Sequence, residues 1–479
     1  MPDFGRLASL LVAGLALAAC AVGPNYVPPQ TPPAGVGAFV SAMPEATSNA
    51  PLPATWWRLY DDPLLDRLVG EALTENQDLK VAAANLAYAQ AVLGEARAGL
   101  LPATNLVAGA SYGRSAGAKA AASPRNAWSY DAGFNAAYQV DLFGRVWRTI
   151  EAAHASADQV QAAEDAVRVT VAAETAGAYA SLCGYAAQAD VARRSLSLAQ
   201  QTYDIILRQR DLGAASDFDV VRAATALEQS RAAVPTLEGQ RRVALFELAA
   251  LLGKTPAEAP VAAAACHVPP HISRQLPVGE GAALLRRRPD VRETERLMAA
   301  DTARIGVAAA DLYPTVSLGG AVASAANSLG GLSSPAAVTV NVGPLISWSF
   351  PNIAVAMARV REARATISGA IAGYHSTVLT ALKETEQALS GYSSEIERHM
   401  ALGAARDLAR DAFGLAEAQY NAGSISFLDR LTAQGVLLGA EQALAASDQA
   451  LSADQVAVFQ ALGGGWEDAP AVVPPKVAG

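Results

Sequence analysis

The chain contains an internal repeat, which restricts its possible folds more than any other feature of its sequence. Glycine, serine, aspartate and alanine recur in the same order around two points, with an offset of 210 residues (423 − 213 = 210). The matched pairs are Gly213 and Gly423, Ser216 and Ser426, Asp219 and Asp429, Ala223 and Ala433, and Gly253 and Gly463. A repeat of this length indicates one structural unit used twice.

Each half contains two segments in which apolar and polar residues alternate. In the clearest, at 128–141, Trp128, Tyr130 and the following even-numbered residues share one face of a strand, and the odd-numbered residues share the other. This register places Asp131 and Asp141 on the polar face. Aromatic residues near both ends of an apolar face about 9–11 residues long are typical of strands that cross an outer membrane. An ordinary sheet with one solvated face is the alternative. The predicted strands lie near 104–113, 128–141, 315–324 and 338–350.

Long helices are predicted around these strands. In the first half one helix begins at Asp62-Pro63 and continues to about Leu101, and another of about 67 residues ends near Leu212. After the turn at Gly213, a helix capped by Ser216 or Asp217 continues to about Leu252. Such lengths favour coiled-coil packing. Apolar residues recur every seven positions at Leu198, Ile205 and Leu212; at Leu237, Ala244 and Leu251; and at Leu437, Leu444, Leu451 and Val458.

The predicted fold class is therefore mainly α with a membrane β-barrel. Each repeat consists of a helix, two strands, a long helix, a turn and a second long helix. One chain supplies four strands, whereas closed membrane barrels start at about eight. Strand edges cannot remain unpaired in lipid, so we expect the chain to assemble with copies of itself. Two, three or four copies all satisfy this argument.

The N-terminus predicts export and lipid attachment. Residues 1–19 carry Arg6 followed by an apolar stretch, which is typical of a secretory signal peptide. The stretch ends in Leu-Ala-Ala-Cys20, which resembles a bacterial lipobox and predicts a lipid on Cys20, the one covalent group expected. Ordinary cleavage beside a spectator cysteine is the alternative. The predicted divisions of the chain are the signal peptide at 1–19, an acylated Pro/Ala-rich tether at 20–55, the first repeat at 56–253, a Pro-rich linker at 254–279, the second repeat at 280–465 and a tail at 466–479.

Composition argues against several classes of function. A net charge of −9 gives no basic surface for nucleic acid. No set of nucleophile, base and orienting residue is recognisable, and no glycine-rich loop follows a predicted strand, so we expect neither an enzyme nor a cofactor. Cys266, His267 and His271 are close in sequence but lie in the Pro-rich linker, which we interpret as solvated rather than as a metal site. Cys183 and Cys266 cannot be paired from sequence, and a disulfide is the less favoured interpretation.

Seven short segments, taken in order, carry a family resemblance. They are LAAC at 17–20, GPNYVPP at 23–29, WWRLYDDPLLDRLVGEAL at 56–73, DLFGR at 141–145, LLRRRPDV at 284–291, GAASDFDVVRA from Gly213 and GSISFLDRLTA from Gly423. With them the chain resembles a lipid-anchored outer-membrane factor of the TolC superfamily, in the branch that serves multidrug and metal efflux pumps. The resemblance implies a homotrimer, with twelve strands in the outer membrane of a Gram-negative bacterium and an α-helical barrel in the periplasm. It also implies an efflux channel for small molecules, supplied by a periplasmic adaptor and an inner-membrane pump of the RND type.

The resemblance further implies a gate at the periplasmic tip. Asp429 and Ile425 correspond to positions that line the constriction. Asp219 corresponds to an acidic residue in tip contacts, and Tyr420 to its hydrogen-bonding partner. Thr432 replaces a second aspartate found in some members, so strong cation binding is not expected. Capping of helices by Asp219 and Asp429 is the alternative role. The implied tip residues are Asp429, Ile425, Asp219, Tyr420, Gly213 and Gly423.

Two other functions are compatible with the sequence. The same fold could serve a heavy-metal pump or type I protein secretion, although the lipobox and the Arg-Arg-Arg-Pro-Asp segment at 286–290 favour small molecules by resemblance. A protein of another class, a periplasmic coiled-coil scaffold lipoprotein, would use the alternating segments as a sheet with one wet face.

Overall fold

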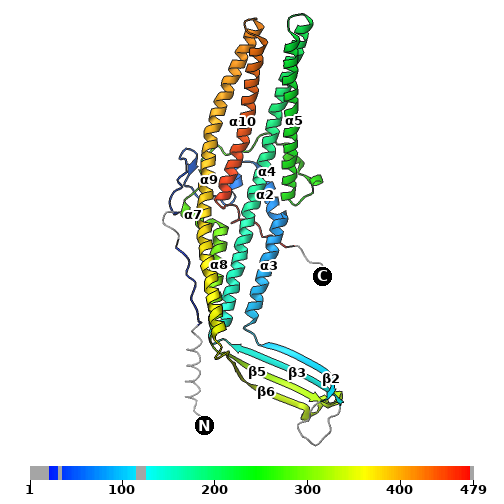
Figure 1. The fold of residues 1–479 in the computed structure, drawn as a ribbon, viewed down its shortest axis with the longest axis vertical. Coiled ribbons are helices and arrows are strands. Elements are labelled where there is room, and N and C mark those ends of the chain that lie inside the picture. The colour runs from blue at the N-terminus through cyan, green and yellow to red at the C-terminus, as the bar shows by residue number, and fades with distance from the viewer. Residues whose placement is uncertain (1–20, 31–34, 115–125, 475–479) are drawn as a thin grey trace. The chain divides into compact units, whose positions relative to one another are not determined.

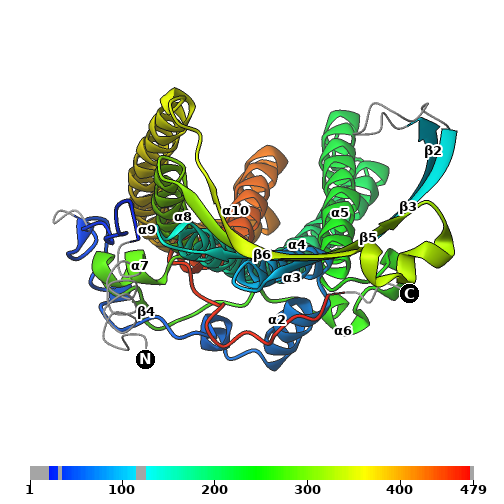
Figure 2. The same cartoon turned by 90° about the horizontal axis from the view of Figure 1, so that it is seen from below.

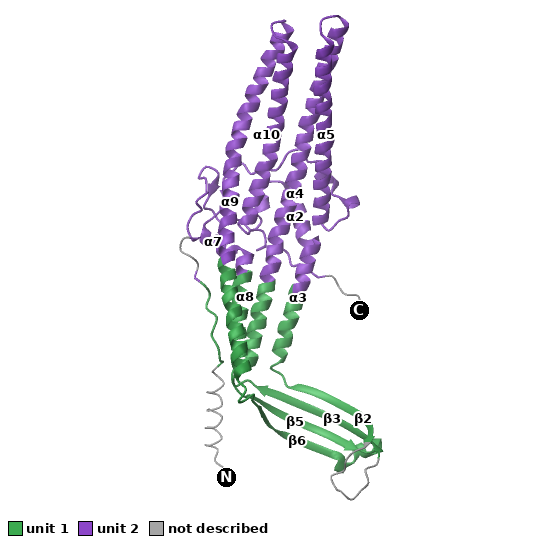
Figure 3. Cartoon of the chain, in the orientation of Figure 1, with its two compact units in different colours: residues 1–29, 86–160, 293–375 green, residues 30–85, 161–292, 376–479 purple. Residues whose placement is uncertain are grey.

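The computed structural model describes residues 21–30, 35–114 and 126–474 and is mainly helical (Figure 1). The predicted signal peptide, Cys20 and the end of the tail lie outside the described residues. The chain forms two compact units, one comprising residues 1–29, 86–160 and 293–375 and the other residues 30–85, 161–292 and 376–479 (Figure 3). Four long helices contribute residues to both units: α3 (Gln77–Ala98), α4 (Arg145–Asp211), α8 (Pro289–Ala310) and α9 (Ala354–Asn421).

Unit 1 contains one four-stranded antiparallel sheet, which Figure 2 shows as a single curved layer. Its strands, in spatial order, are β2 (Ala103–Arg114), β3 (Asn126–Val140), β5 (Thr315–Ala326) and β6 (Val338–Ser347). Leu106 pairs with Phe134, Phe134 with Val322, and Val322 with Val340. Even-numbered residues of all four strands therefore share one face, as the alternation predicts.

Two strands end earlier than predicted, and this changes the role of Asp141. Strand β3 ends at Val140 and β6 at Ser347. Asp141 thus lies outside the sheet, and its Oδ2 accepts a hydrogen bond of 3.0 Å from the backbone N–H of Trp147 in the first turn of α4. The prediction that Asp141 belongs to the polar face of the strand is wrong, because its carboxylate caps the helix that follows.

The predicted helix from residue 62 to 101 is interrupted at Asn76. Asp62 caps its first part, α2 (Pro63–Glu75), with Pro63 in the first position as predicted. The Asn76 side chain ends this part and starts α3, since its Oδ1 accepts the backbone N–H of Leu79 at 3.2 Å and its Nδ2 donates to the carbonyl of Leu251 at 3.0 Å. Asn76 thus bonds to three segments, through its backbone N–H to Ala72 of α2 and through its side chain to α3 and Leu251, which local periodicity did not reveal.

The two repeats each end in a helix hairpin. In the first, the 67-residue α4 is followed by α5 (Asp217–Leu251), and in the second, the 68-residue α9 is followed by α10 (Phe427–Ala461). None of the helices within the described residues is both long and apolar enough to cross a membrane.

Within one chain, the predicted heptad positions of α10 are buried or partly buried, whereas those of the first hairpin do not form the buried seam of α4. Leu437 and Val458 of α10 are buried. By contrast, Leu198 and Ile205 of α4 are at most partly buried, and Leu212, the residue after α4, is 85% exposed. The buried residues of this stretch are small, polar or β-branched: Ala192, Ser195, Ala199, Thr202 and Ile206. Close helix approach through small side chains thus replaced the expected leucine contacts.

The core of unit 2 surrounds a short 3₁₀ helix, η2 (Trp56–Tyr60). The Trp56 ring is fully buried and stacks on Phe459 of α10, with 4.7 Å between ring centroids. Segment 35–55, predicted to be an extended tether, packs against this unit: Phe39 and Leu52 are buried. Strand β1 (Thr47–Ser48) also pairs in parallel with β4 (Leu276–Pro277). The tether prediction is wrong here because apolar side chains anchor the segment.

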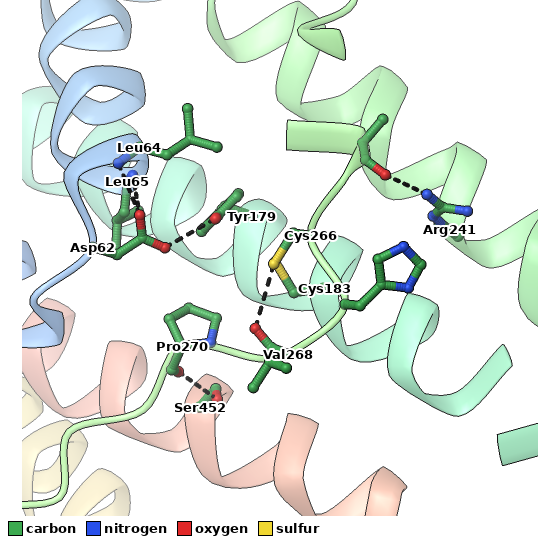
Figure 4. The surroundings of a disulfide bond; sticks show 12 residues. Asp62, Leu64, Leu65, Tyr179, Cys183, Arg241, Cys266, Val268, Pro270 and Ser452 are labelled. Carbon is green, nitrogen blue, oxygen red and sulfur yellow. Dashed lines mark hydrogen bonds between the residues drawn. A yellow bond between two sulfur atoms is a disulfide. The ribbon is translucent and has the colours of Figure 1, made fainter. Parts of the chain in front are cut away.

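Cys183 of α4 forms a disulfide with Cys266 (Figure 4), with 5.0 Å between the Cα atoms. The sequence interpretation, which disfavoured this bond, is wrong. The two residues are 83 positions apart. Only the path of the linker through η3 (Pro256–Glu258) and α6 (Val261–Ala264) brings Cys266 against α4. The remaining short elements are α7 (Gly281–Arg287), η4 (Leu329–Ser333) and η5 (Pro335–Ala337).

A buried charge cluster lies on α4 in unit 2. The side chains of Glu164 and Asp165 are both buried and both bind Arg168, at 2.7 and 2.9 Å, while Arg292 lies 3.9 Å from Asp165. Burial raises the pKa of Asp165 to about 6, although the two arginines favour its charged form. The folded chain therefore binds this proton more tightly than the unfolded chain, whose carboxyl titrates near pH 3.8. This contribution to stability is full at acid pH and is lost as pH rises through about 6.

Asp165→Asn removes this titration, so the melting temperature of the variant minus that of wild type is expected to be larger at pH 7.5 than at pH 4.5. Thermal unfolding of the detergent-solubilised protein measures the difference. Asp211→Asn, at an exposed site on the same helix, is the matched control. Its melting temperature should differ from that of wild type by the same amount at both pH values. An equal shift for Asp165→Asn would contradict the role of burial.

Candidate functional site: the sheet face and the hairpin turns

The apolar face of the sheet is uncovered by the described part of the chain. Val342 at the middle of β6 is 78% exposed. Most other large side chains of this face are also exposed, namely Leu106, Tyr112, Trp128, Phe134, Tyr138, Leu318, Val322, Val340 and Ile346. The opposite face carries Asp131, Asn135 and Asn341. An exposed apolar face of this extent requires an apolar environment, as at a membrane or an interface.

Aromatic rings border this apolar face at both ends. At one end Trp128 lies between Tyr112 and Tyr130, with centroid distances of 5.4 and 5.9 Å. Beyond the end of β6, Trp348 stacks on Phe350 at 4.8 Å. Rings that are apolar but carry a polar edge favour the boundary between lipid and water. The arrangement is that of a sheet adapted to cross a lipid layer.

Strands β2 and β6 form the two edges of the sheet, each with a single neighbouring strand within the described chain. Their outer backbone N–H and C=O groups therefore point away from the sheet without a strand to pair with. In an apolar environment each such group costs several kcal/mol unless it finds a partner. The sheet is consequently incomplete as a membrane structure.

Residues 21–26 are seated on unit 1 beside the end of β3. The buried guanidinium of Arg148 donates to the carbonyl oxygens of Val22 and Gly23, each at 3.3 Å, and to Oδ1 of Asn25 at 2.8 Å. Gly23 has a φ of +96°, and a Cβ there would lie 2.6 Å from the Cα of Gly306. Only glycine fits this close approach. The residue following Cys20 is thereby held at the strand–helix junction.

The two hairpin turns have the same construction, as the repeat predicts. Gly213 and Gly423 have φ values of +75° and +74°, and each donates its N–H to the carbonyl three residues earlier. Ser216 and Ser426 then cap the next helix. This combination of a left-handed glycine and a serine cap reverses the chain within a few residues.

Asp219, which is half-buried, and Asp429, which is exposed, complete these turns as capping boxes. The Ser426 hydroxyl donates to Oδ2 of Asp429 at 2.6 Å and accepts the backbone N–H of Asp429 at 3.2 Å. Asp219 and Ser216 make the same pair of bonds, at 2.7 and 3.2 Å. The hydroxyl and N–H of Ser426 hold the pKa of Asp429 below its usual range. Asp429 is therefore charged at neutral pH.

A polar network behind the second turn was not predicted. Arg430 is only 4% exposed; it donates to Oε1 of Glu417 at 3.1 Å and to Oγ1 of Thr202 at 3.4 Å. Thr202 in turn donates to Gln434 at 3.0 Å. The network joins α9 and α10 to α4. Arg430 lies seven residues before Leu437, so extending the heptad backwards would have placed it in the buried seam.

Within one chain, Tyr420 does not bind Asp219. Its hydroxyl donates to Oε1 of Gln209 on α4 at 2.7 Å, whereas the carboxylate of Asp219 is bound to Ser216. Ile425 is half-buried in the second turn. The structure thus places all the implied tip residues in the two turns or in the helix ends that flank them. Within the described residues, no group of three or more metal-ligating side chains is arranged to hold an ion.

The chain belongs to the family described as "Outer membrane efflux protein", whose sequence model matches residues 68–254 and 282–464. The two matched segments correspond to the two repeats. The chain is 30% identical to nodulation protein T of Rhizobium leguminosarum bv. viciae, over 99% of this chain and 96% of that protein. It is 32% identical to a toluene efflux pump outer membrane protein, TtgC, of Pseudomonas putida, over 96% of each. The solved structure of the outer-membrane channel OprN matches with a TM-score of 0.88 and 34% identity, over 93% of this chain and all of that one.

A charge on the apolar face should disrupt assembly far more than the same charge on the polar face. Val342→Lys places an ammonium in the apolar face and is expected to cost about 2–4 kcal/mol if that face meets lipid. The amount of folded protein in outer-membrane fractions, measured by quantitative immunoblotting, should fall sharply. Asn341→Lys, one residue away on the opposite face, is the matched control and should assemble normally. Equal loss in both variants would argue against lipid contact at Val342.

Proposed function

We propose that this outer-membrane efflux protein is the channel of a tripartite pump and passively conducts small molecules from the periplasm to the exterior. The observation that carries the proposal is the sheet itself, with an uncovered apolar face, aromatic borders and two open edges. Family membership and the similarity to the channel OprN support it. The energy would come from an inner-membrane pump of the RND type, linked through a periplasmic adaptor.

The proposed assembly is a homotrimer. Four strands cannot close a barrel, and β2 of one copy can pair with β6 of the next. Three copies give twelve strands (3 × 4), and repetition of α4, α5, α9 and α10 around the same axis would form the periplasmic helical barrel. Exposed apolar residues on these helices, such as Leu408, Leu415 and Val436, would become contacts between copies.

The proposed cargo is small apolar or amphipathic compounds. The relative TtgC is named for toluene efflux, which supports this class over metal ions or secreted proteins. Export for a heavy-metal pump or type I protein secretion remains the alternative with the same fold.

We further propose that Cys20 carries the lipid anchor and that residues 1–19 are removed as a signal peptide. The hydrogen bonds from Arg148 to residues 22–25 support this, because they hold the chain that follows Cys20 beside the end of β3. The acyl chains would then enter the membrane alongside the sheet. The division into two repeats, linker and tail is part of the same proposal.

The proposed gate is the periplasmic tip formed by the turns at Gly213 and Gly423. Asp429 and Ile425 would form a charged ring and an apolar constriction around the axis. Asp219 and Tyr420 would contribute to contacts at the tip. The network of Arg430, which ties the second hairpin to α4, supports a closed resting state.

The mass of the intact particle tests the assembly. Native mass spectrometry of protein extracted from outer membranes in mild detergent is expected to give three chains, each with acyl mass on Cys20 and without residues 1–19. Cys20→Ser should lose the acyl mass and keep the copy number. A monomer would leave four strands that cannot close, and would favour the scaffold lipoprotein with a wet-faced sheet.

Single-channel conductance in planar bilayers tests the gate. Asp429→Ala and Ile425→Ala are expected to raise the conductance of the isolated channel severalfold, because each removes part of the constriction. Asp429→Ala also removes the carboxylate half of the capping box of α10. Ser426→Ala removes the cap hydroxyl and keeps the charge, so it should change conductance little. If all variants conduct like wild type, the gate lies elsewhere.

A further inference from the structure

Residues 264–272, hereafter the strap, run from the first helix hairpin of unit 2 to the second. At one end the carbonyl of Ala264 accepts a hydrogen bond from Arg241 of α5, and Cys266 is bonded to Cys183 of α4 (Figure 4). His267 Nδ1 lies 2.7 Å from Oδ2 of Asp190, also on α4. Side chains from both helices of the first hairpin thus hold the start of the strap.

The other end of the strap is bound to α10. Ser452 Oγ donates to the carbonyl of Pro270 at 2.7 Å (Figure 4). Gln455 binds the backbone of Ile272 twice, accepting its N–H at 2.9 Å and donating to its carbonyl at 3.0 Å. Gln455 is 1% exposed and also donates to the hydroxyl of Tyr392 on α9 at 3.2 Å. If the strap left, this amide would lose both backbone partners in a buried position.

Among the contacts that hold the strap to the two hairpins, the disulfide is the covalent one. It closes a loop between positions 183 and 266 that contains the whole of α5 and the turn at Gly213. The first hairpin is therefore closed at both ends, by its turn and by the disulfide. Beyond the disulfide, only hydrogen bonds and packing hold the strap to α10. Reduction of the disulfide would loosen the start of the strap, where Cys266 is now fixed to α4.

We propose that Cys183 and Cys266 are an oxidative modification site, at which disulfide formation locks the strap across both hairpins and keeps the resting channel closed. This fixing of the strap by the disulfide, hereafter the lock, is a property of the single chain. Its effect on channel closure rests on the proposed function. In the step itself two thiols lose two protons and two electrons, and a disulfide of an oxidising exchange partner is reduced to two thiols. Cys183 is fully buried and Cys266 only partly. The mixed disulfide therefore forms at Cys266, and the Cys183 thiolate displaces the partner as the strap seats.

Limited trypsin digestion tests the lock, with cleavage at Arg274, an exposed linker residue, as the readout. Wild-type protein under non-reducing conditions is expected to be cleaved slowly. Reduction of the same folded protein, or the double variant Cys183→Ser/Cys266→Ser, should raise the cleavage rate about tenfold, because local opening becomes easier. Reductant added to the double variant should change nothing further. Equal rates before and after reduction would overturn the lock.

Gln455→Ala tests the other end of the strap without touching sulfur. It should raise the cleavage rate at Arg274 in oxidised protein, whereas Gln460→Ala, at an exposed position of the same helix, should not. Equal cleavage rates in these two variants would show that Gln455 does not hold the strap against α10.

Closed-state leak in planar bilayers tests the channel part of the proposal. Reduction should raise the leak of wild type and leave that of the double variant unchanged. Faster cleavage with an unchanged leak would overturn the link to closure while keeping the lock. If oxidised wild type forms no channels at all, the proposed function fails, and the cleavage rates still decide the lock.

Discussion

The need to pair backbone hydrogen-bonding groups in lipid is the constraint on which the rest of the structure depends. A sheet whose large side chains from Leu106 to Ile346 meet an apolar medium cannot keep free edges at β2 and β6. In the proposed assembly other copies of the chain close the sheet, and the helices that continue from the strands repeat around the same axis. The apolar surface left on those helices would then be covered by neighbouring copies.

Sequence reasoning succeeded where a local pattern decided the structure. The alternation placed all four strands and their common face, and the 210-residue offset predicted two turns with the same glycine, serine and aspartate geometry. Proline after Asp62 marked the start of α2. In each case the residues that determine the element lie within a few positions of one another, so their effect is visible without knowledge of the tertiary fold.

The predictions failed where contacts between segments distant in sequence determine the local structure. Asn76 breaks a predicted helix because it also binds Leu251, and Cys266 meets Cys183 only after the linker has folded. The expected leucine seam of α4 gave way to one of small residues, because helix approach in three dimensions sets which face is buried. The gate residues of the site were assigned only through family resemblance. Of its unpredicted members, Arg430 carried a signal in the heptad, whereas Glu417 and Thr202 are recognisable only from the fold.

Each hairpin turn is completed by its own residues, from the left-handed glycine to the aspartate six positions later. The turn therefore does not depend on how many residues precede it in the hairpin. Helical seams repeat every seven residues, so a hairpin can gain or lose about 10 Å in steps of one heptad while its turn and its seam remain intact. The length of a hairpin can therefore change without changing the turn that ends it. Chains of this kind can match aqueous compartments of different depth through helix length alone.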